Sequence, residues 1–305
     1  MADTGVVLRR RRAIAPSWST IGHVLRRWPI LPLFILVILV LTGTIGPIFA
    51  PHNPIKSTLT ARNTPPMWSS EGDNKYVLGT DHVGRDVLSR VIHGARVSLL
   101  VTAISLTSGL IVGTAVGVMA GYADQISPRF GPHIDEILMR VVEITFAVPI
   151  ILVALVIVIV FGQNFGVLLG LLAFVSWNAF PRNVRAEVLT LKTKDYVALA
   201  KVSGASTFRI IFVHILPGVQ NTILVIATLR VGQLILIEAI LSFLGAGVPP
   251  PKPAWGSMIS DGRDYLGDAW WIAFFPGMAI FLVVMALNFL GDWMRDRFDP
   301  RLRQL

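Results

Sequence analysis

Long apolar runs constrain this chain more than any other feature, because about 20 apolar residues are enough to cross a bilayer as a helix. Six such runs occur, at about residues 29–50, 97–121, 137–161, 165–180, 218–244 and 271–290. Charged residues make up only 15% of the 305 positions, whereas soluble domains carry roughly 25%. The sequence therefore predicts an all-α polytopic membrane protein with six transmembrane helices.

The distribution of basic residues predicts how these helices are oriented. More than twice as many Lys and Arg residues lie in segments 1–28, 122–140, 181–217 and 293–305 as in segments 51–96 and 245–270. Cytoplasmic loops of membrane proteins carry this excess of positive charge. We therefore expect a cytoplasmic segment 1–28, an uncleaved first helix at 29–50, and a cytoplasmic tail at 293–305. Both termini would then lie inside the cell, in an N-in, C-in topology.

The net charge of +9 comes from basic residues scattered between the apolar runs. Nucleic-acid binding needs a basic patch or stripe, so the pattern argues against a nucleic-acid partner. The chain has no cysteine, which excludes disulfides and thiolate metal sites. The six histidines are isolated from one another and lack ligand spacing, so no metal site is predicted.

Segment 51–96 is expected to lie outside the cell. Its second half, LGTDHVGRDVLSRVIHGARVSL, has an amphipathic pattern. We interpret it as a capped interfacial helix that leads into the next span, and favour this over a direct contact with substrate.

Small residues recur every four positions in the second apolar run. They are Ser105, Gly109, Gly113, Gly117 and Gly121. This spacing lets two helix backbones approach closely. The pattern predicts a helix–helix interface but does not say whether the neighbouring helix belongs to this chain.

The segment 195–217, DYVALAKVSGASTFRIIFVHILP, is polar-flanked and helix-patterned. Asp195 is a candidate N-cap, Gly204 a candidate helix terminator, and Ser206 a second N-cap. Tyr196, Leu199 and Val202 predict one apolar face, and Phe208, Ile211, Phe212 and Ile215 predict another, with Pro217 ending the second helix. We therefore expect two short amphipathic helices hinged at a glycine, within a cytoplasmic docking loop that covers 181–217.

Three further residues stand out inside the apolar runs. Pro149 should kink the third span. Arg230 and Glu238 are charged at membrane depth, where a charge is costly, so each should face a cavity, a partner or the bundle interior. For Glu238, a place in a translocation pathway and a buried packing role remain equally open.

Catalytic motifs are missing from the sequence. No Gly-Lys dipeptide occurs, so there is no P-loop, and there is no H-E-x-x-H or G-x-S-x-G. The chain is therefore expected not to be an enzyme and to bind no cofactor of its own.

Several stretches resemble one family of transporters. Gly204 with Ile215-Leu216-Pro217 resembles the EAA loop of ABC importer permeases, with Ala198-Leu199-Ala200 in place of the usual Glu-Ala-Ala. The stretch LSFLGAGVPPPKPAWGSMISDGRDYL and the later FFPGMAIFLVVMALNFLGDWMRDRFDPRLR resemble the C-type permease subunits of dipeptide, oligopeptide and nickel importers.

The resemblance implies a type I ABC importer permease fold with a core at 97–292. It implies a B-type permease as the other half of a heterodimer, two cytoplasmic ATPases that bind ATP and Mg²⁺, and an extracytoplasmic substrate-binding protein. The residues implied to contact the ATPase are Ala198, Leu199, Ala200, Lys201, Gly204, Ala205 and Ser206. The implied location is the lipid membrane of a prokaryotic cell.

The substrate implied first is a dipeptide or oligopeptide, with nickel chelates and oligosaccharides as alternatives. An ATP-independent secondary transporter is the rival from another class. It would be expected to carry inverted repeats or several acidic residues within the spans, and Glu238 is the only clear one here.

Overall fold

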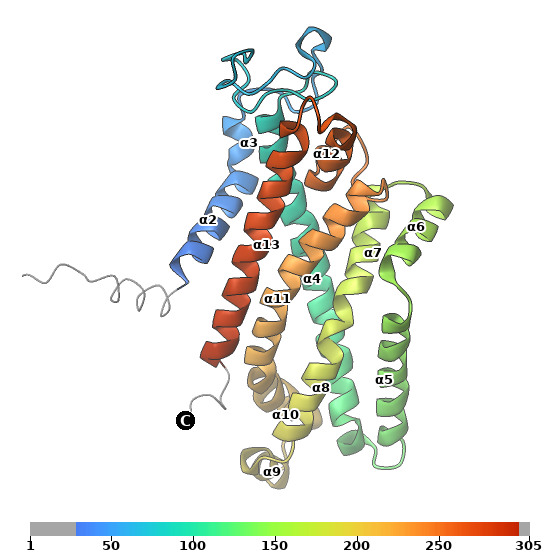
Figure 1. The fold of residues 1–305 in the computed structure, drawn as a ribbon. Helices are drawn as coiled ribbons and strands as arrows, with labels where there is room; N and C mark the ends of the chain where they lie inside the picture. Colours follow the sequence, from blue (N-terminus) through green and yellow to red (C-terminus); the bar gives the residue numbers. More distant parts are fainter. Residues whose placement is uncertain (1–28, 299–305) are drawn as a thin grey trace, which may run out of the picture.

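The computed structural model describes residues 29–298, and within them the chain is entirely helical apart from its loops (Figure 1). The leader 1–28 and residues 299–305 lie outside the described part, so the predictions made for the leader and for most of the tail fall outside it too. The elements are α2 Ile30–Thr44, α3 Gly46–Phe49, η1 Leu59–Ala61, α4 Val87–Ile126, α5 Gly131–Ala147, α6 Ile150–Phe161, α7 Phe165–Trp177, α8 Ala179–Leu191, α9 Asp195–Val202, α10 Thr207–Ile210, η2 Ile211–Ile215, α11 Leu216–Phe243, α12 Trp255–Gly262, η3 Arg263–Tyr265 and α13 Trp271–Phe298.

Four helical stretches are long and apolar enough to cross a membrane: Val87–Ile126, Phe165–Leu191, Thr207–Phe243 and Trp271–Arg297. The pair α5 and α6 makes a fifth if its 81° bend lies within one span, and α2 is a shorter apolar helix. The all-α polytopic class is confirmed. Six transmembrane helices and the N-in, C-in orientation stay predictions.

Two predicted boundaries are wrong because helices continue where a loop or tail was expected, and the capped interfacial helix predicted before the second span is continuous with that span. α4 begins at Val87, ten residues before the predicted span, since Asp86 caps it by accepting a hydrogen bond from the Ser89 N–H at 2.9 Å. α8 runs through 181–191, so the predicted docking loop begins only after Leu191. α13 continues to Phe298, so the first half of the predicted tail is helical.

Two prolines act differently from the expectation. Pro149 bends the third predicted span more sharply than a kink, because it occupies the N-cap of α6 and the axes of α5 and α6 differ by 81°. Pro217 does not end a helix: it is the second residue of α11, directly after a π turn, and the helix continues past it. A single π turn, Ile211–Ile215, joins α10 to α11.

The glycine stripe of α4 forms the central helix contact of the bundle, and the neighbouring helices belong to this chain. Added Cβ atoms at Gly109 and Gly113 would collide with Ser176 and the Trp177 carbonyl, at the end of α7. At Gly117 the added Cβ would lie 2.7 Å from Val184 Cβ, and at Gly121 2.8 Å from Val188 Cβ, both on α8. The packing prediction for this stripe is confirmed.

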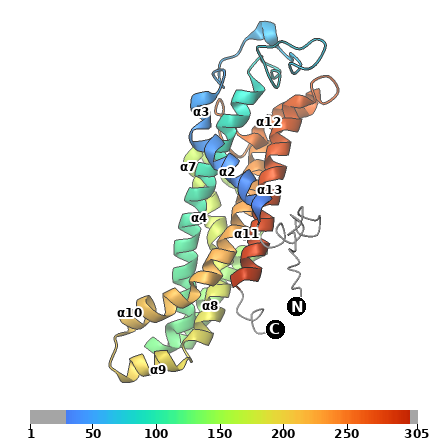
Figure 2. The same cartoon turned by 90° about the vertical axis from the view of Figure 1, so that its left-hand side faces the viewer.

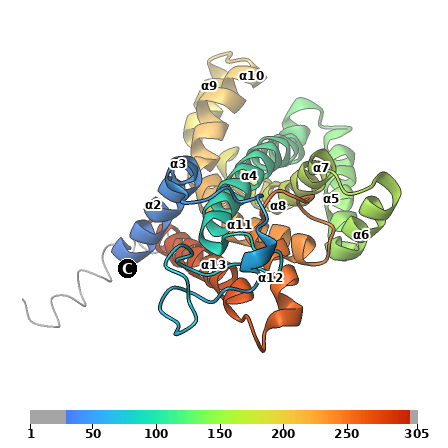
Figure 3. The same ribbon diagram turned by 90° about the horizontal axis from the view of Figure 1, so that it is seen from above.

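The bundle has two distinct ends (Figure 2). We call the end with α9 and α10 the elbow end, and the end with segment 51–86 and α12 the loop end. Seen along the bundle, α2 and the α5–α6 pair lie on opposite sides of the central helices α4 and α11 (Figure 3).

Candidate functional site

The elbow end carries a compact helical corner that we call the elbow, residues 192–215. α9 ends in a Schellman motif, because the Gly204 N–H donates to Lys201 O and the Ala205 N–H to Ala200 O, both at 3.0 Å. Gly204 has φ +78°, which glycine adopts without strain. Ser206 then caps α10 by accepting from the Arg209 N–H at 3.4 Å. The predicted roles of Gly204 and Ser206 are confirmed, whereas the N-cap of α9 is Lys194 and Asp195 is its first helical residue.

Buried side chains seat the elbow on the bundle. Val197 and Ile215 are fully buried and Ile210 is 2% exposed, in one cluster with Tyr122 of α4 and Val188 of α8. Polar contacts support this packing. The Lys192 ammonium lies 2.8 Å from the Asp124 carboxylate and donates to Gly121 O, and Lys201 donates to Gln125. The elbow is therefore joined firmly to the ends of α4 and α8.

The outer face of the elbow is apolar and uncovered. Leu199 is 66% exposed, Val202 89% and Phe208 76%. The rings of Phe208 and Phe212 stack in parallel with centroids 6.2 Å apart, and Phe212 is 60% exposed. The apolar face predicted for α9 thus faces outward, and Val197, which the periodicity missed, provides the packing contact. Exposed apolar groups in such a patch are typical of a protein-binding surface.

The residues implied to contact an ATPase all lie on or beside this face. Ala198, Leu199, Lys201, Gly204 and Ser206 are exposed, and Ala200 and Ala205 are half-buried against the bundle. Their contact with another protein stays a prediction.

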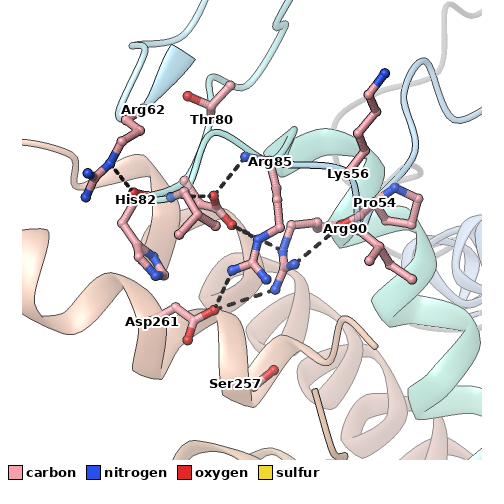
Figure 4. Close-up of polar contacts among 12 residues, drawn as sticks. Pro54, Lys56, Arg62, Thr80, His82, Arg85, Arg90, Ser257 and Asp261 are labelled. Atoms are coloured by element: carbon pink, nitrogen blue, oxygen red, sulfur yellow. Dashed lines mark hydrogen bonds and ion pairs between the residues drawn. The ribbon is translucent and has the colours of Figure 1, made fainter. Parts of the chain in front are cut away.

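A charged network ties the loop end together, and sequence reasoning did not find it (Figure 4). Arg85 Nε donates to Asp81 Oδ2 at 2.6 Å, and its NH2 donates to Asp261 Oδ2 at 3.1 Å. Arg90 lies 3.6 Å from both carboxylates and also donates to Pro54 O at 3.3 Å. Asp81 and Arg90 are each only 2% exposed. The network fastens segment 51–86 to both α4 and α12.

Two tryptophans add to this connection. Trp255 of α12 donates its indole N–H to Val91 O at 2.9 Å, and Trp271 of α13 donates to Thr80 O at 3.0 Å. Both side chains are almost fully buried. The loop end is therefore held by directed hydrogen bonds as well as by ion pairs.

Asp81, His82 and Asp261 come close enough together to resemble a metal-binding group. Two guanidinium groups, from Arg85 and Arg90, already contact both carboxylates. Their positive charge opposes a cation, so these residues fit an ion-pair network better than a metal site.

Glu238 lies inside the bundle. It has no exposed surface, and its carboxylate accepts hydrogen bonds from Ser242 at 2.7 Å and from Ser98 of α4 at 3.3 Å. This placement gives it the partners that a buried packing residue needs. Its place in a translocation pathway stays a prediction.

Arg230 bridges α11 to the junction of α7 and α8. Its NH2 donates to Val175 O at 3.1 Å and to Asn178 Oδ1 at 2.5 Å, and its NH1 donates to Gln233 Oε1 at 2.6 Å. Asn178 separates the two helices, and Val175 O lies in the last turn before it. Arg230 therefore stabilises a break in the span.

Comparisons with known proteins show which family the chain resembles. Residues 113–304 match the family model described as binding-protein-dependent transport system inner membrane component. The di/tripeptide transport system permease protein of Pseudomonas aeruginosa is 38% identical over 286 residues, covering 94% of this chain and 91% of that protein. The dipeptide transport system permease protein of Escherichia coli K12 is 42% identical over 255 residues, covering 84% of this chain and 83% of that protein. Among solved structures, an amino acid ABC transporter matches with a TM-score of 0.49 at 17% identity, covering 71% of this chain and 94% of that one.

Proposed function

Because the chain belongs to the family of binding-protein-dependent transport system inner membrane components, we propose that it is the permease subunit of an ATP-driven importer of short peptides. Both relatives above are named for dipeptide or tripeptide transport and match this chain over most of their length. These names favour a peptide over a nickel chelate or an oligosaccharide. Without a P-loop in its sequence, the chain would depend on partner subunits for ATP and Mg²⁺.

The uncovered apolar face of the elbow is the observation that supports an ATP-driven mechanism. A secondary transporter has no need of an uncovered apolar corner outside the membrane, whereas a subunit that receives force from an ATPase does. Val197 and Ile210 pack the elbow onto the bundle, and α10 continues through one π turn into α11. A push on the exposed face would therefore move α11 as a rigid element.

The assembly that we propose contains this chain, a B-type permease, two ATPases at the elbow end and a substrate-binding protein at the loop end. In that arrangement the elbow end is cytoplasmic and the loop end extracytoplasmic, and six helices cross the membrane with both termini inside.

Reconstitution tests this proposal. The tagged chain would be purified with its co-purifying subunits, placed in liposomes, and assayed for uptake of a radiolabelled dipeptide with and without ATP. We expect uptake that requires ATP and the binding protein. Uptake driven by an ion gradient in the chain alone would instead show a secondary transporter.

A substitution at the elbow separates ATPase docking from folding. Val202→Asp places a charge on a side chain that is 89% exposed, so the chain should still fold. We expect the variant to lose most of its bound ATPase and its ATP-driven uptake. Thr190→Asp adds the same charge to an exposed position of α8 outside the elbow, and should retain both. Equal ATPase recovery in the two variants would refute the docking role.

A further inference from the structure

We propose that Arg230, Gln233 and Asn178 form a carboxylate-binding site midway along the bundle, which takes the C-terminal carboxylate of a peptide in transit. This inference rests on the proposed function and assigns that function a specific recognition site. Arg230 lies 14 residues after Leu216 and 13 before Phe243, the ends of α11. At about 1.5 Å per residue it is roughly 20 Å from either end.

The charge of Arg230 has no acidic partner within residues 29–298. Its three hydrogen-bond acceptors, Gln233, Val175 O and Asn178, are all neutral. Its Nε is buried and has no hydrogen-bond partner in the described part of the chain. A charge without a counter-ion is costly at membrane depth, and such residues are usually functional. Its presence indicates that an anion meets it during function.

Glu238 does not compensate this charge. It lies eight residues further along α11, about 12 Å in helical rise, and Ser98 and Ser242 already bond its carboxylate. Glu238 also has no exposed surface. No carboxylate within residues 29–298 therefore supplies the missing anion.

The neighbours of Arg230 show that the site opens outward from the bundle. Gln233 is exposed, one turn along α11 from the half-buried Arg230. A polar amide exposed midway along a membrane helix indicates a cavity or a water-filled path rather than lipid. Arg230 and Gln233 together would line such a path between this chain and a second permease.

The chemistry of the site fits a carboxylate. A guanidinium presents a planar set of donors that matches the two oxygens of a carboxylate. Asn178 and Val175 O hold one side of the guanidinium in place, which reduces the entropy lost on binding. Every peptide with a free C-terminus carries this group whatever its side chains are. Recognition at Arg230 would therefore accept peptides of different sequence.

The absence of cysteine in the chain allows a direct test in the reconstituted complex. Gln233→Cys introduces a single thiol beside Arg230. An anionic thiosulfonate reagent and a cationic one of similar size would be compared during ATP turnover. With Arg230 present, we expect the anionic reagent to react at least about tenfold faster relative to the cationic one. Arg230→Gln in the same background should remove that preference, and Arg230→Lys should keep most of it.

A second measurement links the site to the substrate. A saturating dipeptide with a free carboxylate should slow the anionic labelling of the introduced thiol several-fold. The same dipeptide with a C-terminal amide, added at a concentration that saturates the binding protein, should protect much less. Equal protection by both peptides would overturn the proposal.

The remaining outcomes are equally decisive. A thiol that does not react, or that shows no charge preference, would mean that lipid or an acidic residue of the second permease covers Arg230, and would overturn the proposal. Failure of the complex to take up any peptide with ATP would instead refute the proposed function itself, so the two failures are distinguishable.

Discussion

Replacing Asp81 by alanine should release segment 51–86 from the bundle. Asp81 is 2% exposed and lies between two arginines. Its removal would leave the buried Arg90 and the largely buried Arg85 to share Asp261 alone. Removing one partner from a buried ion-pair network costs about 3–5 kcal/mol, because the remaining charges stay buried without compensation. That cost raises the population of the locally open state roughly 150- to 5,000-fold.

Hydrogen exchange in the purified complex measures this opening. The amides of Thr80 and Val87 are suitable reporters, because they donate to the backbone oxygens of Thr64 and Gly79 at 2.9 and 3.0 Å, and not to Asp81. We expect their exchange to accelerate by at least about 100-fold in Asp81→Ala. Asp81→Asn keeps an oxygen for hydrogen bonding but lacks the charge, so its amide exchange rates should lie between those of the wild type and of Asp81→Ala.

The matched control is another aspartate of the loop end. Asp264 is paired with Arg263 at 3.1 Å, but the two side chains are 72% and 61% exposed. Exposed pairs contribute about 0–1 kcal/mol, so Asp264→Ala should change exchange by about fivefold or less. If Asp81→Ala has no larger effect than Asp264→Ala, the reasoning about the buried network is wrong.

Three further substitutions test the packing and the elbow. Gly117→Val should destabilise the purified chain by about 1–3 kcal/mol, because its side chain would meet Val184. Gly170→Val is the control, because no atom lies within 4 Å of a Cβ added there, and it should change thermal stability little. Equal losses of stability in Gly117→Val and Gly170→Val would contradict the packing role of Gly117. Gly204→Ala should destabilise the elbow by about 1–2 kcal/mol, because alanine disfavours the positive φ at this position. Faster proteolytic cleavage within the elbow would show this loss, and Gly204→Asn should be cleaved less than Gly204→Ala. Trp255→Phe loses the hydrogen bond to Val91 O, an oxygen that also accepts within helix α4, so thermal unfolding should show a loss of about 0.5–1.5 kcal/mol.

Local patterns were predictable from the sequence. The glycine stripe, the turn at Gly204 and the cap at Ser206 each depend on a few neighbouring residues, and the structure confirms them. Gly166 and Gly170 are also four residues apart, but no neighbouring helix within residues 29–298 lies against them. The pattern predicts that close packing is possible and does not identify the partner.

The loop-end network was not predictable because it depends on tertiary structure. Arg85 and Asp261 are 176 positions apart, and nothing in either local sequence indicates that they meet. Two helix boundaries were wrong for a related reason. A polar stretch such as 181–191 was assigned to a loop, although its buried face packs against the glycines of α4. Burial of one face is enough to extend a helix beyond its apolar run.

The correction at Pro217 changes the mechanical argument. A helix that ended there would leave the elbow connected to the membrane by a loop, which transmits force poorly. The helix instead runs from Thr207 to Phe243, so the exposed Phe208 and the half-buried Arg230 lie on one element. The 22 residues between them correspond to about 33 Å of helix. Movement of the elbow by a bound ATPase would therefore displace Arg230 together with α11, while its hydrogen bonds to Asn178 and Val175 O hold it to the α7–α8 break. Displacement of α11 would strain or break those bonds, and this would make the affinity of the site for a carboxylate depend on the position of the elbow.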